Sequence, residues 1–528
     1  MPHEFFCERF PVGELKDGVD VSLDTDKIGI HPFDELPNEL LQKLMWFLRD
    51  KQSGRNRDRN KYPTWGRTYK MTPFLKLLVT PCLQTLDLIF IENGSYISDV
   101  LRLATIRSPH LKMLRLDHTS HQYVRSYSFI AKFTKLRLLT DDTAHDDFFD
   151  LIGSYCPDLR ELSLSPGNDF KVTDLGIRRL CVDGNCKSIR LLDLGGRSKV
   201  TTKGIQLALD NLPQLRILKH VSLLKCLADI VQTAKDNTLP KYSLSEMKIY
   251  RDLPFCVQQS NLLPQFFLLC PNVTHVIFHM WERERFEDAD LLSLLSLDKL
   301  HTISISNCAA IFNVQKNIRI DRELTFPKVI SLFKKFGHCL KSLKFSGILV
   351  DVPAIIKFCP KLESLYLWYT NCTTTNQSTA TKLKSPVILH NLKKLTISSD
   401  ATISSENLLA LLSSPSLSYI SISKCDALTD DIFQRTMNLH SFRNLESLRL
   451  NLCQYVTKKG IDLFMKESNP IRLIILCPTD AIAREDINDW NDNAIWIRKN
   501  WDFNFYLCYK GKSEQRLGGN RNFWEAFS

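Results

Sequence analysis

The sequence lacks the features that would place it among membrane, secreted or fibrous proteins. No run of about 18 apolar residues occurs, so no transmembrane helix is expected. The start, Met1 to Glu4, has neither a basic stretch nor an apolar core, so no signal peptide is expected. The 19 glycines and 22 prolines exclude a collagen-like or linker-like chain. None of the 16 cysteines forms the C-x-x-C pair of a zinc site, so we expect them to be reduced and mostly buried.

Motifs for catalysis are also missing. The sequence has no P-loop, no G-x-G-x-x-G, no G-x-S-x-G, no H-E-x-x-H and no protein-kinase motif. His275 and His279 would share one face of a strand about 13 Å apart, too far to hold one metal ion. We therefore expect no enzymatic activity, no metal and no cofactor. The net charge of +11 allows nucleic-acid or acidic protein partners without favouring either.

Leucine is the residue in excess, at 79 of 528 positions, and regular leucine spacing is typical of repeat proteins. The frame L-x-x-L-x-L, with other apolar residues replacing leucine in places, recurs along most of the chain. Its copies begin at Leu83, Leu111, Leu136, Leu159, Ile189, Leu215, Leu244, Val273, Leu300, Leu340, Leu362, Leu392, Leu417, Leu445 and Ile471. The mean spacing of about 28 residues lies in the range of leucine-rich repeats.

Each repeat is expected to form a short strand followed by a helix. Alternate side chains of a strand point to opposite faces, so the frame leucines face a core and the residues between them face outward. After the strand, Thr173 is a suitable N-cap, and Asp174 suits the positive end of a helix dipole. One strand cannot bury its own leucines, so neighbouring repeats must stack. The predicted fold is an α/β leucine-rich repeat solenoid, a right-handed horseshoe.

Two recurring phrases resemble the cysteine-containing leucine-rich repeat proteins. The first, C-P-x-L-x-x-L-x-L-x-x-C, is carried in part by Cys156, Cys270 and Cys359 before proline and by Cys308, Cys425 and Cys453 after the frame. The second, V-T-x-x-G-I, begins at Val172, and close variants begin at Val200 and Val456. The resemblance implies a ribonuclease-inhibitor-like fold and a reduced cytoplasmic or nuclear protein that holds a protein partner.

The segment before the repeats resembles the first helix of an F-box. It reads L-P-x-E-L-L-x-K-L from Leu36 and has an apolar stripe at helical spacing. The resemblance implies docking on the Skp-type adaptor of a cullin-RING ubiquitin ligase through Leu36, Pro37, Leu40, Leu41, Leu44 and Leu48. An F-box continues with a second helix that carries V-C-x-x-W, whereas this chain has the basic stretch Lys51 to Lys61.

Other interpretations of this segment stay open. An amphipathic helix can also be a plain cap over the first leucine face of an open solenoid. The elongin-binding box of other cullin receptors needs S-L-x-x-x-C, which is absent. The basic loop 49–70 interleaves Tyr62, Trp65 and Tyr69 with Lys and Arg. It could contact nucleic acid or a phosphorylated ligand, but a solvated loop is the favoured interpretation.

The outward strand positions predict where a partner binds. Positions 3, 5 and 7 of each frame face the concave surface, and most carry small polar residues. Against that background stand Lys248, Tyr250, His275, His279, Lys344, Tyr366, Trp368, Tyr419 and Arg449. Interface energy concentrates in Trp, Tyr and Arg, and the cations favour an acidic or phosphorylated segment of a protein target.

These observations support two functions. The first is a substrate receptor of an SCF-type cullin-RING ubiquitin ligase, in which the N-terminal helix docks on the adaptor and the concave face recruits a target for ubiquitination. The second is a stand-alone leucine-rich repeat scaffold or inhibitor with no link to ubiquitin. Neither involves a membrane, and nucleic acid is the less favoured partner.

Four regions are expected along the chain. An N-terminal arm covers residues 1–30, and the F-box-like or capping segment covers 31–82. The solenoid covers 83–478 in about 15 repeats, irregular over 221–340, with an insertion near Ala309 to Arg322 in a repeat of 40 residues. Residues 479–528 hold four tryptophans and are expected to form a C-terminal cap.

Overall fold

The computed structural model describes residues 33–45 and 75–490, except the gaps at 90, 92–93, 117–126, 142–143, 165–171, 196–197, 235–238, 251–261, 281–287, 308–325, 369, 373–387, 399–401, 466–470, 472, 477–481, 483–484 and 487–488. The chain divides into two compact units, Met1–Leu215 (unit 1) and Arg216–Ser528 (unit 2). The predicted insertion and the basic loop 49–70, as well as most of the predicted C-terminal cap, lie outside the described residues. Within the described part of the chain, no helix is both long and apolar enough to cross a membrane.

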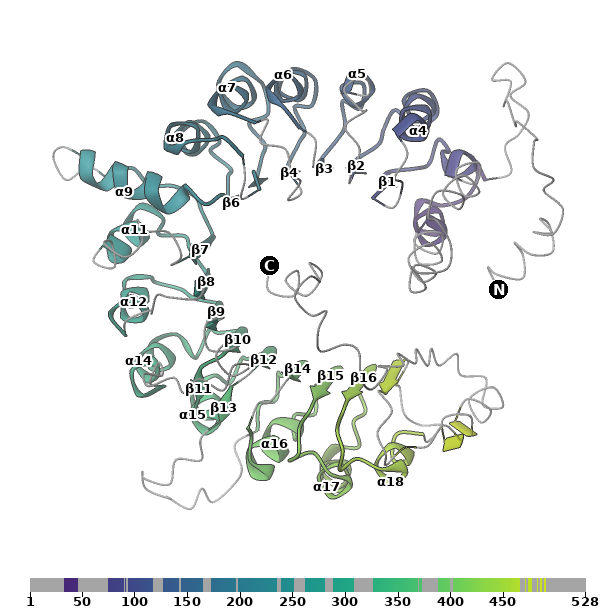
Figure 1. Ribbon diagram of the computed structural model, residues 1–528, viewed down its shortest axis with the longest axis vertical. Helices are drawn as coiled ribbons and strands as arrows, with labels where there is room; N and C mark the ends of the chain where they lie inside the picture. Colours follow the sequence, from purple (N-terminus) through teal and green to yellow (C-terminus); the bar gives the residue numbers. More distant parts are fainter. Residues whose placement is uncertain are drawn as a thin grey trace, which may run out of the picture. The chain divides into compact units, whose positions relative to one another are not determined.

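Unit 1 alternates strands and helices. Its elements are β1 (Thr85–Asp87), α4 (Gly94–Arg107), β2 (Met113–Arg115), α5 (Tyr127–Ile130), β3 (Leu138–Thr140), α6 (Asp146–Tyr155), β4 (Glu161–Ser163), α7 (Asp174–Arg178), η4 (Arg179–Asp183), β5 (Leu191–Asp193) and α8 (Thr202–Asn211). Strands β1 to β5 pair in chain order, and all pairs are parallel. The strands form one layer and the helices the other (Figure 1).

Unit 2 continues the alternation. Its elements are β6 (Ile217–Lys219), α9 (Leu223–Thr233), β7 (Glu246–Tyr250), α11 (Leu263–Leu269), β8 (His275–Met280), α12 (Asp288–Leu292), η6 (Ser293–Ser296), β9 (Thr302–Asn307), α14 (Phe326–Phe336), β10 (Ser342–Ser346), β11 (Leu349–Val350), α15 (Val352–Phe358), β12 (Ser364–Trp368), β13 (Asn371–Cys372), β14 (Lys394–Ser398), α16 (Ser405–Leu412), β15 (Tyr419–Ser423), α17 (Asp430–His440), β16 (Ser447–Asn451), α18 (Lys458–Asp462) and β17 (Leu473–Leu476). A nine-stranded parallel sheet runs in the order β17-β16-β15-β14-β12-β10-β9-β8-β7, and β11 pairs with β13 beside it.

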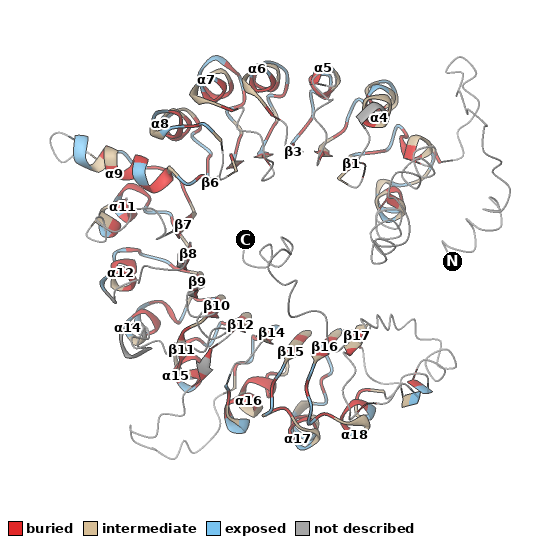
Figure 2. Cartoon of the chain, viewed as in Figure 1, coloured by how far each residue is buried: buried red, intermediate tan, exposed pale blue. Residues whose placement is uncertain are grey.

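Every predicted frame carries a strand. Leu343 and Leu365 pair in register on β10 and β12, and both are buried. The weak frames at Leu244, Val273 and Leu300 form the regular strands β7, β8 and β9, so the sheet continues through much of the stretch expected to be irregular. Buried residues follow the contact between the strand and helix layers (Figure 2). The fold is therefore an α/β leucine-rich repeat solenoid, as predicted.

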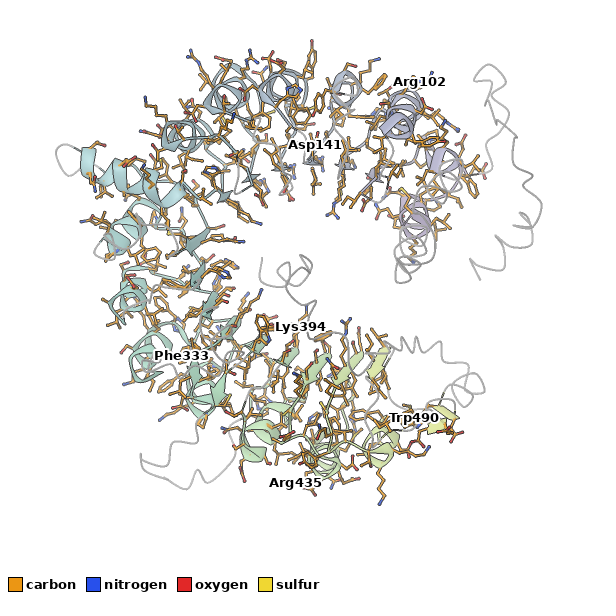
Figure 3. All side chains as sticks on the ribbon, viewed as in Figure 1. Arg102, Asp141, Phe333, Lys394, Arg435 and Trp490 are labelled. Carbon is orange, nitrogen blue, oxygen red and sulfur yellow. The ribbon has the colours of Figure 1, made fainter. Side chains whose placement is uncertain are left out.

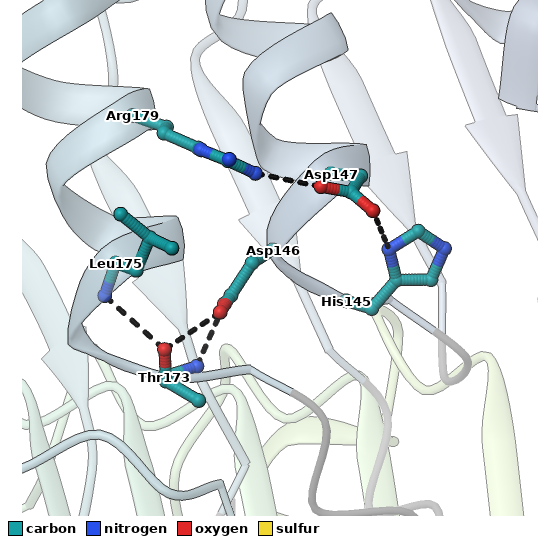
Figure 4. Close-up of polar contacts among 6 residues, drawn as sticks. All are labelled: His145, Asp146, Asp147, Thr173, Leu175 and Arg179. Atoms are coloured by element: carbon teal, nitrogen blue, oxygen red, sulfur yellow. Dashed lines mark hydrogen bonds and ion pairs between the residues drawn. The ribbon is translucent and has the colours of Figure 1, made fainter.

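A recurring hydrogen-bond pair, here called the Asp–Thr clasp, links one repeat to the next. Asp146 starts α6, and its carboxylate accepts from Thr173 N (2.8 Å) and Thr173 Oγ1 (2.6 Å), 27 residues later (Figure 4). Thr173 Oγ1 also accepts from Leu175 N and so caps its own helix. The same clasp joins Asp174 to Thr201 and Asp430 to Thr457.

The clasp explains the glycine of V-T-x-x-G-I. A Cβ built on Gly204 would overlap Asp174 Oδ1, and Gly176 and Gly460 face Asp146 and Asp430 in the same way. Because the Asp carboxylate reaches the backbone N–H of Thr, the helix of the next repeat lies close to that carboxylate. The position of the glycine therefore has no room for a larger residue. The phrase therefore specifies the contact between repeats as well as the start of a helix.

The cysteines of the described chain are free thiols, and most are buried. Burial raises the pKa of Cys156, Cys270 and Cys359 to about 12. In addition, Cys186 Sγ donates to the carbonyls of Ile152 and Cys156. Cys82 differs because it is exposed. The buried thiols are structural, since a thiolate is the reactive form of cysteine and burial disfavours it.

This difference predicts the order of chemical labelling. With iodoacetamide at pH 8, Cys82 is expected to react with the native protein, whereas Cys156, Cys270 and Cys359 react only after unfolding, because raised pKa values and burial leave almost no accessible thiolate. Mass spectrometry of peptides after timed labelling measures each site. Labelling of Cys156 in the native protein at the rate seen in urea would contradict its placement in the core.

Candidate partner-binding sites

The candidate target site lies on the open face, which we define as the side of the nine-stranded sheet that faces away from the helices. Frame positions 3, 5 and 7 project there, because positions 4 and 6 are buried against the helices. Register places Lys344 of β10 beside Tyr366 of β12, and Tyr366 beside Thr396 of β14. The sheet therefore brings side chains from well-separated repeats into rows across the open face.

The structure places most of the predicted target-site residues on this face, all in unit 2. His275 and Arg449 are exposed, and Lys248, Lys344, Tyr366 and Tyr419 are half-buried. Tyr250 lies at the end of β7, and its side chain is outside the described residues. His279 and Trp368 are buried, with 9% and 4% of their surface exposed. Whether a partner binds this set stays a prediction.

Burial shapes the electrostatics of the open face. Burial, together with a smaller contribution from the nearby Lys248, lowers the pKa of His279 to about 4, so His279 is neutral near pH 7. Burial also lowers the pKa of Lys344, an effect that Glu246 opposes. Burial, together with a smaller contribution from Tyr419, raises the pKa of Tyr366 to about 12. His279 is therefore not one of the cations of this face.

The expectation that Trp368 is exposed is wrong. Trp368 occupies frame position 7 at the end of β12, where register sets it between Ser346 of β10 and Ser398 of β14. These small neighbours leave room for the larger indole, and Ser346 beside it is completely buried. The alternation rule gives the face of a residue but not what covers it. Trp368 therefore contributes to packing rather than to an exposed binding surface.

One cation of the open face was not among the predicted residues. Lys394 is exposed at frame position 3 of β14 and points away from α16 (Figure 3). Register pairs Lys394 with Tyr419 of β15, and Arg449 Cζ of β16 lies 5.3 Å from the centre of the Tyr419 ring. The signal was present in the sequence, because the frame starting at Leu392 is clear and puts a lysine at position 3.

The candidate adaptor site is the helix over residues 38–45 in unit 1. Its inner side contacts the first repeat: Asn38 Oδ1 accepts from Gln84 N (2.9 Å), and Gln42 Nε2 donates to Thr85 Oγ1 (3.0 Å). Before the helix, Asp34 and Arg107 form an ion pair at 2.5 Å. The helix is thus fixed along the edge of β1 by contacts within the chain.

The predicted adaptor residues divide between two sides of this helix. Leu40 is 42% exposed, Pro37 is exposed, and Leu36 and Leu44 are half-buried. Leu41 is completely buried and so does not lie on an exposed docking surface. The single stripe predicted from helical spacing is wrong in this respect, because Leu41 packs inward while Leu40 faces out. Leu48 lies outside the described residues.

Comparison with known proteins supports no closer assignment than the fold. No family model and no curated protein sequence matches the chain. The structure is similar to the yeast Rad7–Elc1 complex, at 14% identity and a TM-score of 0.39, over 84% of this chain and 95% of that one. It is also similar to the mouse RP105/MD-1 complex, at 13% identity and a TM-score of 0.35, over 82% of this chain and 88% of that one. A third similar structure is the TLR13–ssRNA13 complex, at 16% identity and a TM-score of 0.37, over 76% of this chain and 55% of that one. These values are too low to transfer a partner to this chain.

Proposed function

We propose that this chain is a non-catalytic protein-binding scaffold and serves as the substrate receptor of an SCF-type cullin-RING ubiquitin ligase. In this role the helix over residues 38–45 docks on a Skp-type adaptor, and the open face of unit 2 holds the target. Another subunit supplies the chemistry. The ligase would act on a protein recruited to Lys248, Lys344, Tyr366, Tyr419 and Arg449.

One observation carries the adaptor half of the proposal. The helix is held on its inner side by Leu41, Asn38 and Gln42, yet it leaves Leu40 42% exposed beside Pro37. An exposed leucine on a short, fixed helix is available to a partner without rearrangement of the fold. This arrangement suits an adaptor-binding surface, since pre-organised apolar side chains lose little conformational entropy on binding.

A second function is favoured by the inner contacts of the same helix. Leu41 is buried, and Asn38 covers the N–H of Gln84 at the edge of β1. These contacts are sufficient to explain the helix as a cap, because the first repeat of a solenoid must be shielded. The alternative is therefore a stand-alone leucine-rich repeat scaffold or inhibitor that binds its partner without a ubiquitin ligase.

Replacement of Leu40 by aspartate distinguishes the two functions. In the full-length chain, Leu40→Asp is expected to weaken binding to the Skp-type adaptor at least about tenfold, because a charge would be buried without a partner at the interface. Biolayer interferometry with immobilised adaptor measures the affinity, and circular dichroism checks the fold.

Leu439→Asp is the matched control, since Leu439 is 61% exposed near the end of α17 in unit 2. It is expected to leave adaptor binding unchanged. If the wild-type chain has no affinity for the adaptor, the ubiquitin-ligase function is wrong and the stand-alone scaffold stands. Equal losses in both variants would point to a non-specific effect of charge and would also contradict the proposed docking helix.

A further inference from the structure

A cluster of two cationic side chains, one aromatic ring and one hydroxyl lies on three neighbouring strands of unit 2. We define the Tyr419 cluster as Lys394 of β14, Tyr419 of β15, and Arg449 and Ser447 of β16. Register places Lys394 beside Tyr419 and Tyr419 beside Ser447. Parallel strands lie about 4.8 Å apart, so the two long cationic side chains can reach the same region from either side of Tyr419. The cluster therefore has a cation on each flank of an aromatic ring.

The Tyr419 ring orients one of the cations. Arg449 Cζ lies 5.3 Å from the ring centre, within the range of a cation–π contact. A guanidinium that lies over a ring keeps the N–H groups at its edge available, and those groups match two oxygens of an anion. Tyr419 thus limits the rotamers of Arg449 while leaving its donors usable.

The charge of the cluster is not balanced within the described residues. Lys394 and Arg449 are both exposed, and neither forms an ion pair with a described residue. The preceding residue, Lys393, differs because it forms a salt bridge with Glu363 at 2.9 Å. In addition, Ser447 Oγ is buried and has no hydrogen-bond partner among the described residues. Two exposed positive charges therefore flank Tyr419 without an anionic partner in the part of the chain described.

We propose that the Tyr419 cluster binds a phosphorylated serine or threonine of the protein target. A phosphomonoester carries a charge of about −1.5 to −2 at pH 7 and three acceptor oxygens, which suit one Arg and one Lys. A single carboxylate carries only one charge and two oxygens and would leave one cation unmatched. The inference rests on the proposed role of the open face as the target site, and it makes target binding depend on a kinase.

The experiment measures binding of a minimal probe to the full-length protein. The probe is a short peptide of alanine and glycine with one central phosphoserine, observed by ³¹P NMR line broadening. The wild type is expected to broaden the signal, and the double variant Lys394→Gln/Arg449→Gln to reduce the affinity at least about tenfold, because charge-assisted hydrogen bonds are lost. The control Lys393→Gln/Lys357→Gln removes the same net charge outside the cluster, from the residue before β14 that pairs with Glu363 and from α15, and is expected to bind as the wild type does.

Competition identifies the chemical source of the anion. The same peptide with unmodified serine is expected not to displace the probe, and the peptide with glutamate is expected to displace it at least about tenfold less well than the phosphopeptide does. Equal displacement by the glutamate peptide would replace the proposal with an acidic target. Tighter binding of a single-stranded oligonucleotide that is lost in the double variant would replace it with nucleic acid.

The remaining outcomes separate this inference from the proposed ligase function. Equal broadening by the wild type and the double variant would overturn the phosphate site, whatever the adaptor affinity. Conversely, a phosphate site confirmed in a chain that does not bind the adaptor would leave this inference intact and assign it to the stand-alone scaffold. Circular dichroism of both double variants checks that the fold is retained.

Discussion

Replacing Trp368 by alanine is expected to lower the free energy of unfolding by about 3–5 kcal/mol, the usual cost of removing a large buried aromatic side chain. The indole is only 4% exposed, and the serines in register on either side cannot fill the space that it leaves. The cost combines the lost burial of apolar surface with the cavity that remains. Urea denaturation followed by far-ultraviolet circular dichroism measures the change in midpoint.

Two further variants test the reason for this loss. Trp368→Phe keeps most of the aromatic volume and is expected to be destabilised less than Trp368→Ala. Arg449→Ala removes an exposed side chain of the same face and is expected to change the midpoint little, because its ring contact is at the surface. An alanine variant at position 368 that unfolds at the wild-type midpoint would show that the indole does not stabilise this part of the sheet.

The Asp–Thr clasp predicts an unusual coupling between Asp174 and Gly204. Gly204→Ala is expected to destabilise the wild type by about 1–3 kcal/mol, because the new Cβ would overlap Asp174 Oδ1. In the background of Asp174→Ala the same change is expected to cost less, because the overlap with the carboxylate is gone and alanine favours a helix over glycine by about 1 kcal/mol. Asp174→Ala alone removes the bonds to Thr201 N (2.7 Å) and Oγ1 (2.5 Å) and should cost about 1–3 kcal/mol.

A double-mutant cycle measures this coupling, with urea midpoints of the four proteins as the data. The equivalent cycle at Asp430 and Gly460 is an internal replicate, because the same overlap occurs there. Part of the cost at Gly204 is expected to remain in the double variant, since Val200 Cγ1 would lie 2.8 Å from the new Cβ. If Gly204→Ala has the same effect with and without Asp174, the close approach of the clasp does not select glycine.

The fold could be predicted because each repeat solves the same packing problem. Each repeat carries the same two local sequence patterns, which are leucines that alternate along a strand and then an N-capped helix. Even weak frames such as Val273 formed strands, because the neighbouring strands fix their register. The clasp was not predicted, although the sequence placed Thr173 and Asp174 at the start of a helix. A hydrogen bond between Asp146 and Thr173 depends on how two repeats stack, which no single repeat specifies.

The candidate sites could be predicted only in part. Alternation correctly placed Lys344, Tyr419 and Arg449 on the open face. It failed for Trp368, because exposure depends on what lies above a strand and not only on which way a side chain points. Similarly, helical spacing grouped Leu40 with Leu41 in one apolar stripe. In the structure the helix packs beside β1 with Leu41 buried and Leu40 exposed.

The position of Asn38 has a consequence for solubility. A parallel sheet presents unpaired main-chain groups along its outermost strand, and such an edge can recruit a strand from another molecule and start aggregation. Here the amide of Asn38 accepts the N–H of Gln84 just before β1, and Gln42 bonds the side chain of Thr85 within it. The short helix therefore covers the free edge of β1. A truncation that removed the helix would expose this edge to pairing with a strand of another molecule.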